Sequence, residues 1–267
     1  MKKILFLLII LNLFFISCNK NGNRTINTSD SYSIFLKEIS KYNYQKEKID
    51  DYYNIYKENE NIIYCLNVIN YPNFLLPSSY THKAIINGNL TLVNTNYLLS
   101  SSYVPKDLVE VTDVDYIERK NQTMKLEKET LEAYKMLEKD AKNKGYELTI
   151  FSAYRSYEYQ SDLYKYSTDK SFVAKPGASE HQTGLAIDIG KRNSGLTGHF
   201  DQTEEAFYLA HNAHKFGFIL RYPKNGYDIT GYPYESWHYR YVGKDVAEII
   251  YKKNITLEEY FYNYVLL

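Results

Sequence analysis

Two short phrases of the sequence concentrate histidine, carboxylate and other polar side chains in a way that a hydrophobic core would not. Residues 179–190 read Ser-Glu-His-Gln-Thr-Gly-Leu-Ala-Ile-Asp-Ile-Gly, and residues 234–241 read Tyr-Glu-Ser-Trp-His-Tyr-Arg-Tyr. Imidazole nitrogens and carboxylate oxygens are zinc ligands, and a set of three leaves one coordination position open for water. The chemistry available to such a set is metal-assisted hydrolysis, in which a further carboxylate takes the proton of that water.

The candidate ligands in these phrases are His181, Asp188 and His238, with Glu235 as a second carboxylate nearby. Around Asp188 the apolar residues alternate, so a strand would place them on one face and the carboxylate on the other. Burying a carboxylate there is costly unless it is paired or bound to a metal. The alternative is that all four are polar side chains with satisfied hydrogen bonds, and the HExxH signature of zinc proteases is absent. The spacing alone leaves both interpretations open.

The elements that must position these residues are helices mixed with short strands. Periodicity and capping residues predict helices over 29–59, 123–144, 155–166 and 203–216, with Gly145 and Gly217 as terminators. Strands are predicted over 147–153, 184–190, 218–222 and 236–242, and a turn at 87–89. The apolar run 62–69 fits either a strand or a helix. Because strands and helices do not alternate regularly, the sequence predicts an α+β fold with a mainly antiparallel sheet.

The composition is that of an ordinary globular protein. The chain has 267 residues, 44% of them hydrophobic and 24% charged, so it can bury a core. The formal net charge of +0 argues against a nucleic-acid partner, which usually requires a basic face. The 30 tyrosines are attributed mainly to compositional bias, since Lys, Asn and Ile are also plentiful.

The N-terminus has the pattern of an export signal. Lys2 and Lys3 precede the apolar run 4–16, and Ser17-Cys18 is followed by polar residues. This resembles a bacterial lipoprotein signal, which predicts a signal peptide over 1–18, lipidation of Cys18 and a tether over 19–27. The protein is then expected to be exported and held at the membrane of the cell envelope by its lipid, facing the cell wall. A plain signal peptide or an uncleaved anchor are the alternatives. Cys65 is expected to be a small buried residue.

The pattern Ser-x-His-x6-Asp followed by Glu-x2-His resembles one known family. It is similar to the VanY-type D-alanyl-D-alanine carboxypeptidases and the related LD-carboxypeptidases, which have the Hedgehog/DD-peptidase fold. Further segments carry the resemblance: 92–94, 103–109, 152–156 with Gln160 and Leu163, 216–223 and 229–232. It covers about residues 90–267, and so implies a catalytic domain over 89–267. A small, mostly helical region over 28–88 would precede that domain.

The resemblance also implies a role for each residue of the site. One Zn²⁺ per chain would be bound by His181, Asp188 and His238. Glu235 would act as the general base and then deliver the proton to the leaving amine, and Arg155 would hold the scissile carbonyl and its developing oxyanion. The side chains expected to line the substrate pocket are Ser179, Gln160, Tyr154 and Trp237. For the two aromatic residues among them, packing in the core is an equal interpretation.

The remaining histidines and two arginines are expected to lie outside the chemistry. The histidines are His82, His199, His211 and His214, of which the last two share a helical face and are read as surface or supporting residues. Arg221 and Arg240 alternate with aromatic residues in predicted strands and are expected to form structural pairs.

The predicted function is therefore hydrolysis of the C-terminal D-alanine of peptidoglycan stem peptides. The expected partners are those peptides and the membrane, with no nucleic acid. An LD-carboxypeptidase acting on tetrapeptide stems is the nearest alternative, because the phrase Ser-Glu-His-Gln-Thr-Gly occurs in both kinds of enzyme. An endopeptidase of the phage-lysin kind and a non-catalytic module that binds the cell wall are further alternatives.

Overall fold

The computed structural model describes residues 28–42, 44–60, 62, 65–66, 69, 81–120, 122–170, 172–193, 195–196 and 199–265. The predicted signal peptide, the lipidation site Cys18 and the tether 19–27 lie outside the described residues. Among the helices of the described part, none combines the length and the apolar character needed to cross a membrane.

The N-terminal region is helical, but the prediction of one helix over 29–59 is wrong. The chain forms α1 (Thr28–Ile39), then η1 (Lys46–Lys48) and α2 (Ile49–Asn59). The helix is interrupted before η1, where Gln45 has an extended backbone and its N–H donates to the Tyr52 hydroxyl at 3.2 Å. This reversal lets the rings of Phe35 and Tyr56 approach to 5.3 Å between centroids. Cys65 is buried in the same cluster, as expected.

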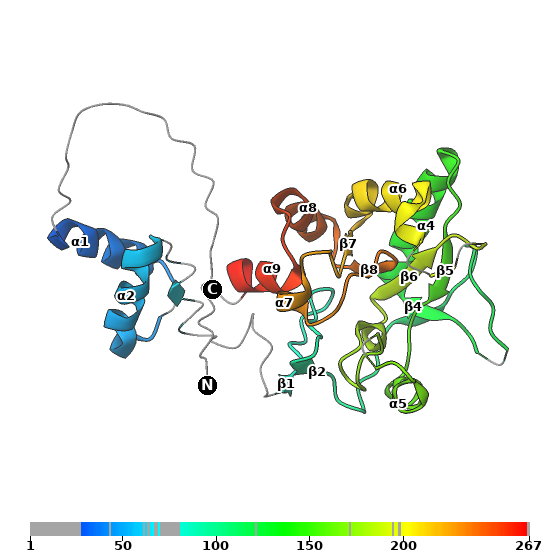
Figure 1. Ribbon diagram of the computed structural model, residues 1–267, viewed down its shortest axis with the longest axis horizontal. Coiled ribbons are helices and arrows are strands. Elements are labelled where there is room, and N and C mark those ends of the chain that lie inside the picture. The colour runs from blue at the N-terminus through cyan, green and yellow to red at the C-terminus, as the bar shows by residue number, and fades with distance from the viewer. Residues whose placement is uncertain are drawn as a thin grey trace, which may run out of the picture.

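The centre of the fold is a four-stranded sheet. Its strands are β5 (Thr149–Ser152), β6 (Ala186–Gly190), β7 (Phe218–Leu220) and β8 (His238–Tyr241), arranged in the order β5-β6-β8-β7. All three pairings are antiparallel, which confirms the predicted sheet. One face packs against α4 (Lys128–Asn143) and α6 (Glu204–Asn212) in the main hydrophobic cluster. In Figure 1, α5 (Tyr157–Tyr166) lies on the other side of the sheet from α4.

A strand replaces the first turn of the helix predicted over 123–144. β4 (Lys125–Glu127) pairs with β3 (Leu108–Glu110) in antiparallel fashion, with Val109 opposite Leu126. Helix α4 starts only at Lys128, where the Glu127 side chain accepts a hydrogen bond from the Glu129 backbone N–H. The hydrophobic pattern of the sequence could not separate β4 from α4, because three residues are too few to distinguish the period of a strand from that of a helix. The predicted terminator Gly145 follows the helix with φ +87°.

The remaining elements surround the sheet. They are β1 (His82–Lys83), β2 (Tyr97–Leu98), η2 (Glu180–Thr183), η3 (Phe200–Gln202), η4 (Ala213–Phe216), α7 (Tyr227–Thr230), α8 (Lys244–Lys253) and α9 (Leu257–Tyr264). The helix predicted over 203–216 is thus split into α6 and η4, and it ends at Gly217 as expected. β1 lies before residue 88, the expected end of the N-terminal region, and β2 lies after it, so this strand pair joins the two expected regions. Neither C-terminal helix was predicted; both pack with Ile219 in a second cluster.

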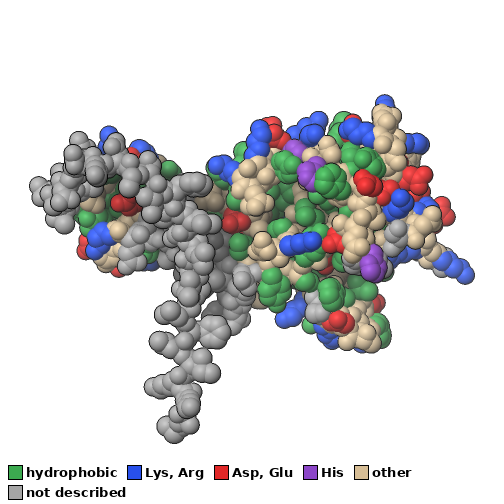
Figure 2. Space-filling model, turned by 45° about the horizontal axis from the view of Figure 1, so that its top comes forward, with side chains coloured by type: hydrophobic (Ala, Val, Ile, Leu, Met, Phe, Trp, Pro, Cys, Tyr) green, Lys and Arg blue, Asp and Glu red, His purple; other side chains and the backbone are tan. Residues whose placement is uncertain are grey.

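The surface carries charges of both signs. On the face drawn in Figure 2, Lys and Arg side chains alternate with Asp and Glu side chains around exposed hydrophobic groups. The two signs are therefore mixed on this face.

Candidate metal centre

The register of β6 and β8 brings two of the predicted ligands together. Asp188 is the direct partner of His238 in this antiparallel pair, so the two side chains share a face. The next pair, Ile187 and Tyr239, faces the other way into the main hydrophobic cluster. Strand alternation therefore places the carboxylate and the imidazole side by side and keeps the apolar residues in the core.

A tight turn brings the third predicted ligand over the same face. His181 lies in η2, which ends at Gly184 with φ +70°. This backbone angle favours glycine, and a Cβ atom here would also lie 3.2 Å from the Glu127 backbone nitrogen. Across the turn, His181 Nε2 lies 3.3 Å from Asp188 Oδ2. The turn sets the distance between the histidine and the strand that carries Asp188.

The three side chains form a compact, buried donor set. One donor atom from each of His181, Asp188 and His238 lies within 4.8 Å of the others. Asp188 approaches the two imidazoles with different oxygens: Oδ2 lies 3.3 Å from His181 Nε2, and Oδ1 lies 3.1 Å from His238 Nδ1. Tetrahedral zinc with bonds of about 2.0–2.1 Å would hold its donors about 3.3 Å apart. The residues present therefore fit a zinc ion with one further position open.

Each imidazole is oriented by a second partner. His181 Nδ1 lies 2.7 Å from the Ala153 carbonyl oxygen, which can only accept, so this nitrogen carries the proton. The other nitrogen, Nε2, is left with a lone pair toward Asp188. On His238, Nε2 lies 3.4 Å from Glu180 Oε2, and Nδ1 faces Asp188. Such outer partners fix the tautomer and the direction of metal-binding histidines.

Glu235 lies beside the donor set and is almost buried. Its side chain precedes β8, it is 9% exposed, and its Oε2 is 3.7 Å from His238 Nδ1. Burial raises the pKa of Glu235 to about 7, although the neighbouring His238 acts in the opposite direction. A carboxyl group with a pKa near neutrality can both accept and return a proton. The geometry therefore allows the predicted acid–base role.

Arg155 is fixed by two of the residues predicted to line the pocket. Its Nε donates to Gln160 Oε1 at 2.9 Å, and its Nη2 donates to Ser179 Oγ at 3.3 Å. A bulge in β5 places Ser152 opposite Asp188, and the Ser152 hydroxyl accepts from Arg155 Nη1 at 2.8 Å. The guanidinium therefore lies next to the donor set, 3.8 Å from Asp188, with its side chain 17% exposed.

The two aromatic residues predicted as pocket walls lie in different surroundings. Tyr154 is half-buried and lines a small pocket that Arg155 also lines, but none of the three donor residues lines that pocket. Trp237 is half-buried and packs against the main hydrophobic cluster, in agreement with the alternative that this residue packs in the core.

The electrostatics of the metal-free centre hold a proton on one histidine. Burial and the neighbouring Arg155 lower the pKa of His181 to about 4. Burial alone would lower the pKa of His238 as well, but hydrogen bonds to Asp188 and Glu180 outweigh it and raise the pKa to about 9. Burial would raise the pKa of Asp188, but His181 and His238 hold it well below its usual range. Two anions thus converge on one imidazole, an arrangement that a divalent cation can also satisfy.

Glu180 is a residue of the site that the sequence analysis missed. Its Oε1 accepts from Arg221 Nε and from Arg240 Nη1, both at 2.7 Å. The predicted structural pairing of both arginines is confirmed. Burial would raise the pKa of Glu180, but the two guanidinium groups outweigh it and lower the pKa. Arginines in predicted apolar strands need acidic partners if they are buried, and that requirement was the available signal.

The other histidines lie apart from the donor set, as expected. His211 is exposed, with Nδ1 2.8 Å from the Phe207 carbonyl oxygen. His214 is buried and stacks on Tyr251 with ring centroids 3.7 Å apart. His82 and His199 are exposed.

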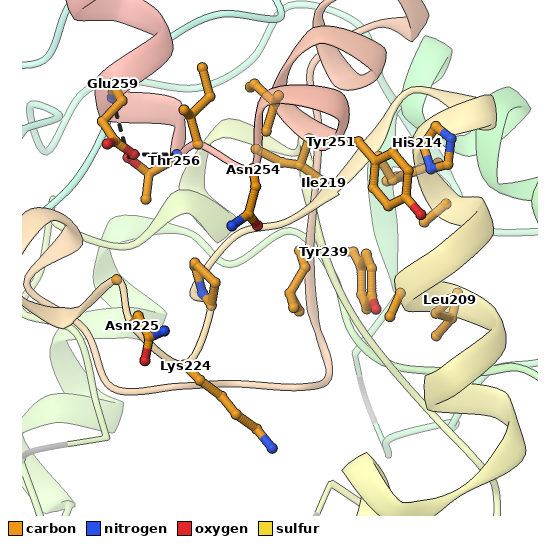
Figure 3. Close-up of a pocket in the computed structure, with 18 of the residues that line it drawn as sticks. Leu209, His214, Ile219, Lys224, Asn225, Tyr239, Tyr251, Asn254, Thr256 and Glu259 are labelled. Atoms are coloured by element: carbon orange, nitrogen blue, oxygen red, sulfur yellow. Dashed lines mark hydrogen bonds between the residues drawn. The ribbon is translucent and has the colours of Figure 1, made fainter. Parts of the chain in front are cut away.

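A separate cavity of about 460 Å³ lies on the opposite side of β8. Figure 3 shows Tyr239, Ile219 and Leu209 on its walls, with Lys224 and Asn225 on one side. Tyr239 points away from the face that carries His238, and none of the donor residues lines this cavity. The chemistry therefore belongs to the buried donor set and not to the larger hollow.

The sequence is similar to those of known carboxypeptidases. A family model described as VanY, D-alanyl-D-alanine carboxypeptidase, matches residues 123–244. "Putative carboxypeptidase YodJ" of Bacillus subtilis (strain 168) is 46% identical over 182 residues, which cover 64% of this chain and 66% of that protein. The chain thus spans slightly less than two thirds of this relative. The bifunctional D-Ala-D-Ala dipeptidase and D-Ala-D-Ala carboxypeptidase VanXYC of Enterococcus gallinarum is 35% identical over 184 residues, 65% of this chain and 93% of that protein.

Two solved structures resemble the fold. The LdcB LD-carboxypeptidase superposes with a TM-score of 0.62 at 41% identity, over 71% of this chain and 98% of that chain. A variant of the vancomycin-resistance D,D-pentapeptidase VanY, in complex with Zn(II), superposes with a TM-score of 0.51 at 33% identity. The match covers 65% of this chain and 98% of that chain. The predicted fold, mixed helices with small antiparallel sheets, is confirmed by this similarity.

Proposed function

The chain belongs to the VanY family of D-alanyl-D-alanine carboxypeptidases, and on that premise we propose that it is a zinc carboxypeptidase. Its substrates would be peptidoglycan stem peptides, from which it would release the C-terminal D-alanine. The observation that carries the proposal is the buried donor set of His181, Asp188 and His238, with Glu235 3.7 Å from His238. The Zn(II) complex of a related structure supports the choice of metal.

The residues of this chain divide the chemistry among them. Zinc bound by the donor set would lower the pKa of a coordinated water and polarise the peptide carbonyl. Glu235, whose Oε2 lies 3.7 Å from His238 Nδ1, takes the proton of the attacking water and returns it to the leaving amine. Arg155, held by Gln160 and Ser179, donates to the oxyanion that develops on the carbonyl oxygen.

A second candidate is the LD reaction on tetrapeptide stems. The similarity to the LdcB LD-carboxypeptidase favours it, while the family model and VanXYC favour the DD reaction. Both reactions would use the same donor set and the same base, so the substrate pocket decides between them.

Paired substrates test the proposal. The purified full chain, loaded with zinc, is incubated with a pentapeptide stem ending in D-Ala-D-Ala and with a tetrapeptide stem ending in one D-Ala. Mass spectrometry should show loss of one alanine, and a chelator should abolish it because the reaction depends on the metal. Cleavage of the tetrapeptide alone would establish the LD reaction. Intact peptides in the presence of bound zinc would contradict the proposal and point to an endopeptidase or a binding module.

Glu235→Gln should separate chemistry from metal binding. Because general acid and general base steps are both lost, we expect kcat to fall by about 10²–10⁴-fold. Zinc content, measured by plasma mass spectrometry, should stay at that of the wild type, since Glu235 is not in the donor set. Glu132→Gln on the exposed surface of α4 is the matched control and should keep full activity. Unchanged turnover in Glu235→Gln would remove this residue from the mechanism.

The proposed location is the cell envelope, with the protein anchored by lipid at Cys18. The support is the pattern of basic residues, apolar run and Ser17-Cys18 at the N-terminus. Cell fractionation tests it: the wild type should sediment with membranes, and Cys18→Ser should lose its acyl chains in mass spectrometry. A wild-type protein that carries no lipid would refute the anchor and leave the enzymatic proposal intact.

A further inference from the structure

A series of buried polar contacts connects the metal centre to the last helix of the chain. From His238 Nε2 the contacts run to Glu180, from Glu180 to Arg221 at 2.7 Å, and from Arg221 to Glu258 in α9. Arg221 donates to both carboxylate oxygens of Glu258, at 2.8 Å and 2.6 Å. Asn94 Nδ2 donates to the same carboxylate at 3.0 Å. We call His238, Glu180, Arg221 and Glu258 the buried charge chain.

The charges beneath His238 balance only when α9 is in place. Glu180 is 1% exposed, and Arg221, Arg240 and Glu258 are each 0% exposed. Two carboxylates thus neutralise two guanidinium groups with almost no help from water. Removing one partner of a buried ion pair leaves an uncompensated charge in the interior. Glu258 is therefore needed to balance the positive charges of Arg221 and Arg240.

Within the buried charge chain, Arg221 is the residue whose hydrogen bonds can change partner. Arg240 is fixed, because its Nη2 also donates to the Thr91 carbonyl oxygen at 2.7 Å. Arg221 gives one bond to Glu180 and two bonds to Glu258. With the negative charge of Glu258 removed, the favoured partner for the fork of Arg221 is a bidentate pair with Glu180. That pairing would draw Glu180 Oε2 away from His238.

We propose that Glu258 is a positioning residue for the metal ligand His238, acting through Arg221 and Glu180. By occupying both terminal nitrogens of Arg221, Glu258 leaves one oxygen of Glu180 to orient the imidazole. The inference rests on the metal-binding role of His238 in the proposed function. It adds α9 and Asn94 to the centre, and both lie outside the residues 123–244 that the family model matches.

The test compares a substitution of Glu258, which belongs to the buried charge chain, with a substitution of Thr256, the N-cap of α9, which does not. Glu258→Gln keeps the size of the side chain and removes its charge. Thr256→Ala removes the cap that Figure 3 shows bonded to Glu259, and leaves Glu258 intact. Thr256→Ala therefore reports any effect that comes only from a weaker helix.

Zinc affinity of the full chain is measured by competition with a chromophoric chelator. Glu258→Gln should raise the dissociation constant about 10-fold, the lower end of the effect of outer partners of metal-bound histidines. Thr256→Ala should lower the melting temperature without changing zinc affinity. Wild-type affinity in Glu258→Gln, or an equal loss in Thr256→Ala, would overturn the inference. A wild-type protein that binds no zinc would instead contradict the proposed function, and this inference with it.

A measurement on the wild type covers the case in which Glu258→Gln does not fold. If α9 supports the metal ligand, linkage requires that zinc support α9 in return. Hydrogen exchange should therefore slow more in the α9 amides on zinc binding than in the amides of α8. Helix α8 packs in the same hydrophobic cluster, but the hydrogen bonds and ion pairs of the buried charge chain described above run to α9 and not to α8. Equal slowing in both helices would overturn the inference.

Discussion

Ionised side chains that fold into the interior must be compensated there, and this constraint governs the centre of the antiparallel sheet. Asp188 and Glu180 converge on His238 from two sides, and Glu180 is held in turn by Arg221 and Arg240. Loss of one partner in such a buried pair typically costs about 3–5 kcal/mol. Each element that supplies a charge is therefore tied to the others.

This constraint explains why residues far apart in the sequence meet at one place. η2 supplies Glu180 and His181, β6 supplies Asp188, and β8 supplies His238 and Arg240. A buried polar network of this kind favours one arrangement of its members, because each alternative leaves a charge without a partner. For a catalytic centre such rigidity is useful, since the donor atoms must already lie close to the positions that a metal demands.

The sequence predicted the members of the donor set better than the elements around it. Alternation about Asp188 and the histidine phrases marked these residues as candidates, and the family resemblance implied the ligand set that the structure brings together. It could not supply the register that sets Asp188 opposite His238, since pairing is a property of two distant strands. The break before Gln45 and the strand β4 were missed for a similar reason: tertiary pairing overrode the local helical pattern. Glu180 and Glu258 were missed because their partners are set only by the fold.

The central claim is that the buried donor set is a metal centre. Crystals of the protein grown with zinc, with data collected on both sides of the zinc absorption edge, test it most directly. The account predicts one anomalous peak between His181 Nε2, His238 Nδ1 and a carboxylate oxygen of Asp188, with bonds of about 2.0–2.2 Å. A peak bound elsewhere, for example at His214, with nothing between these three residues, would contradict it.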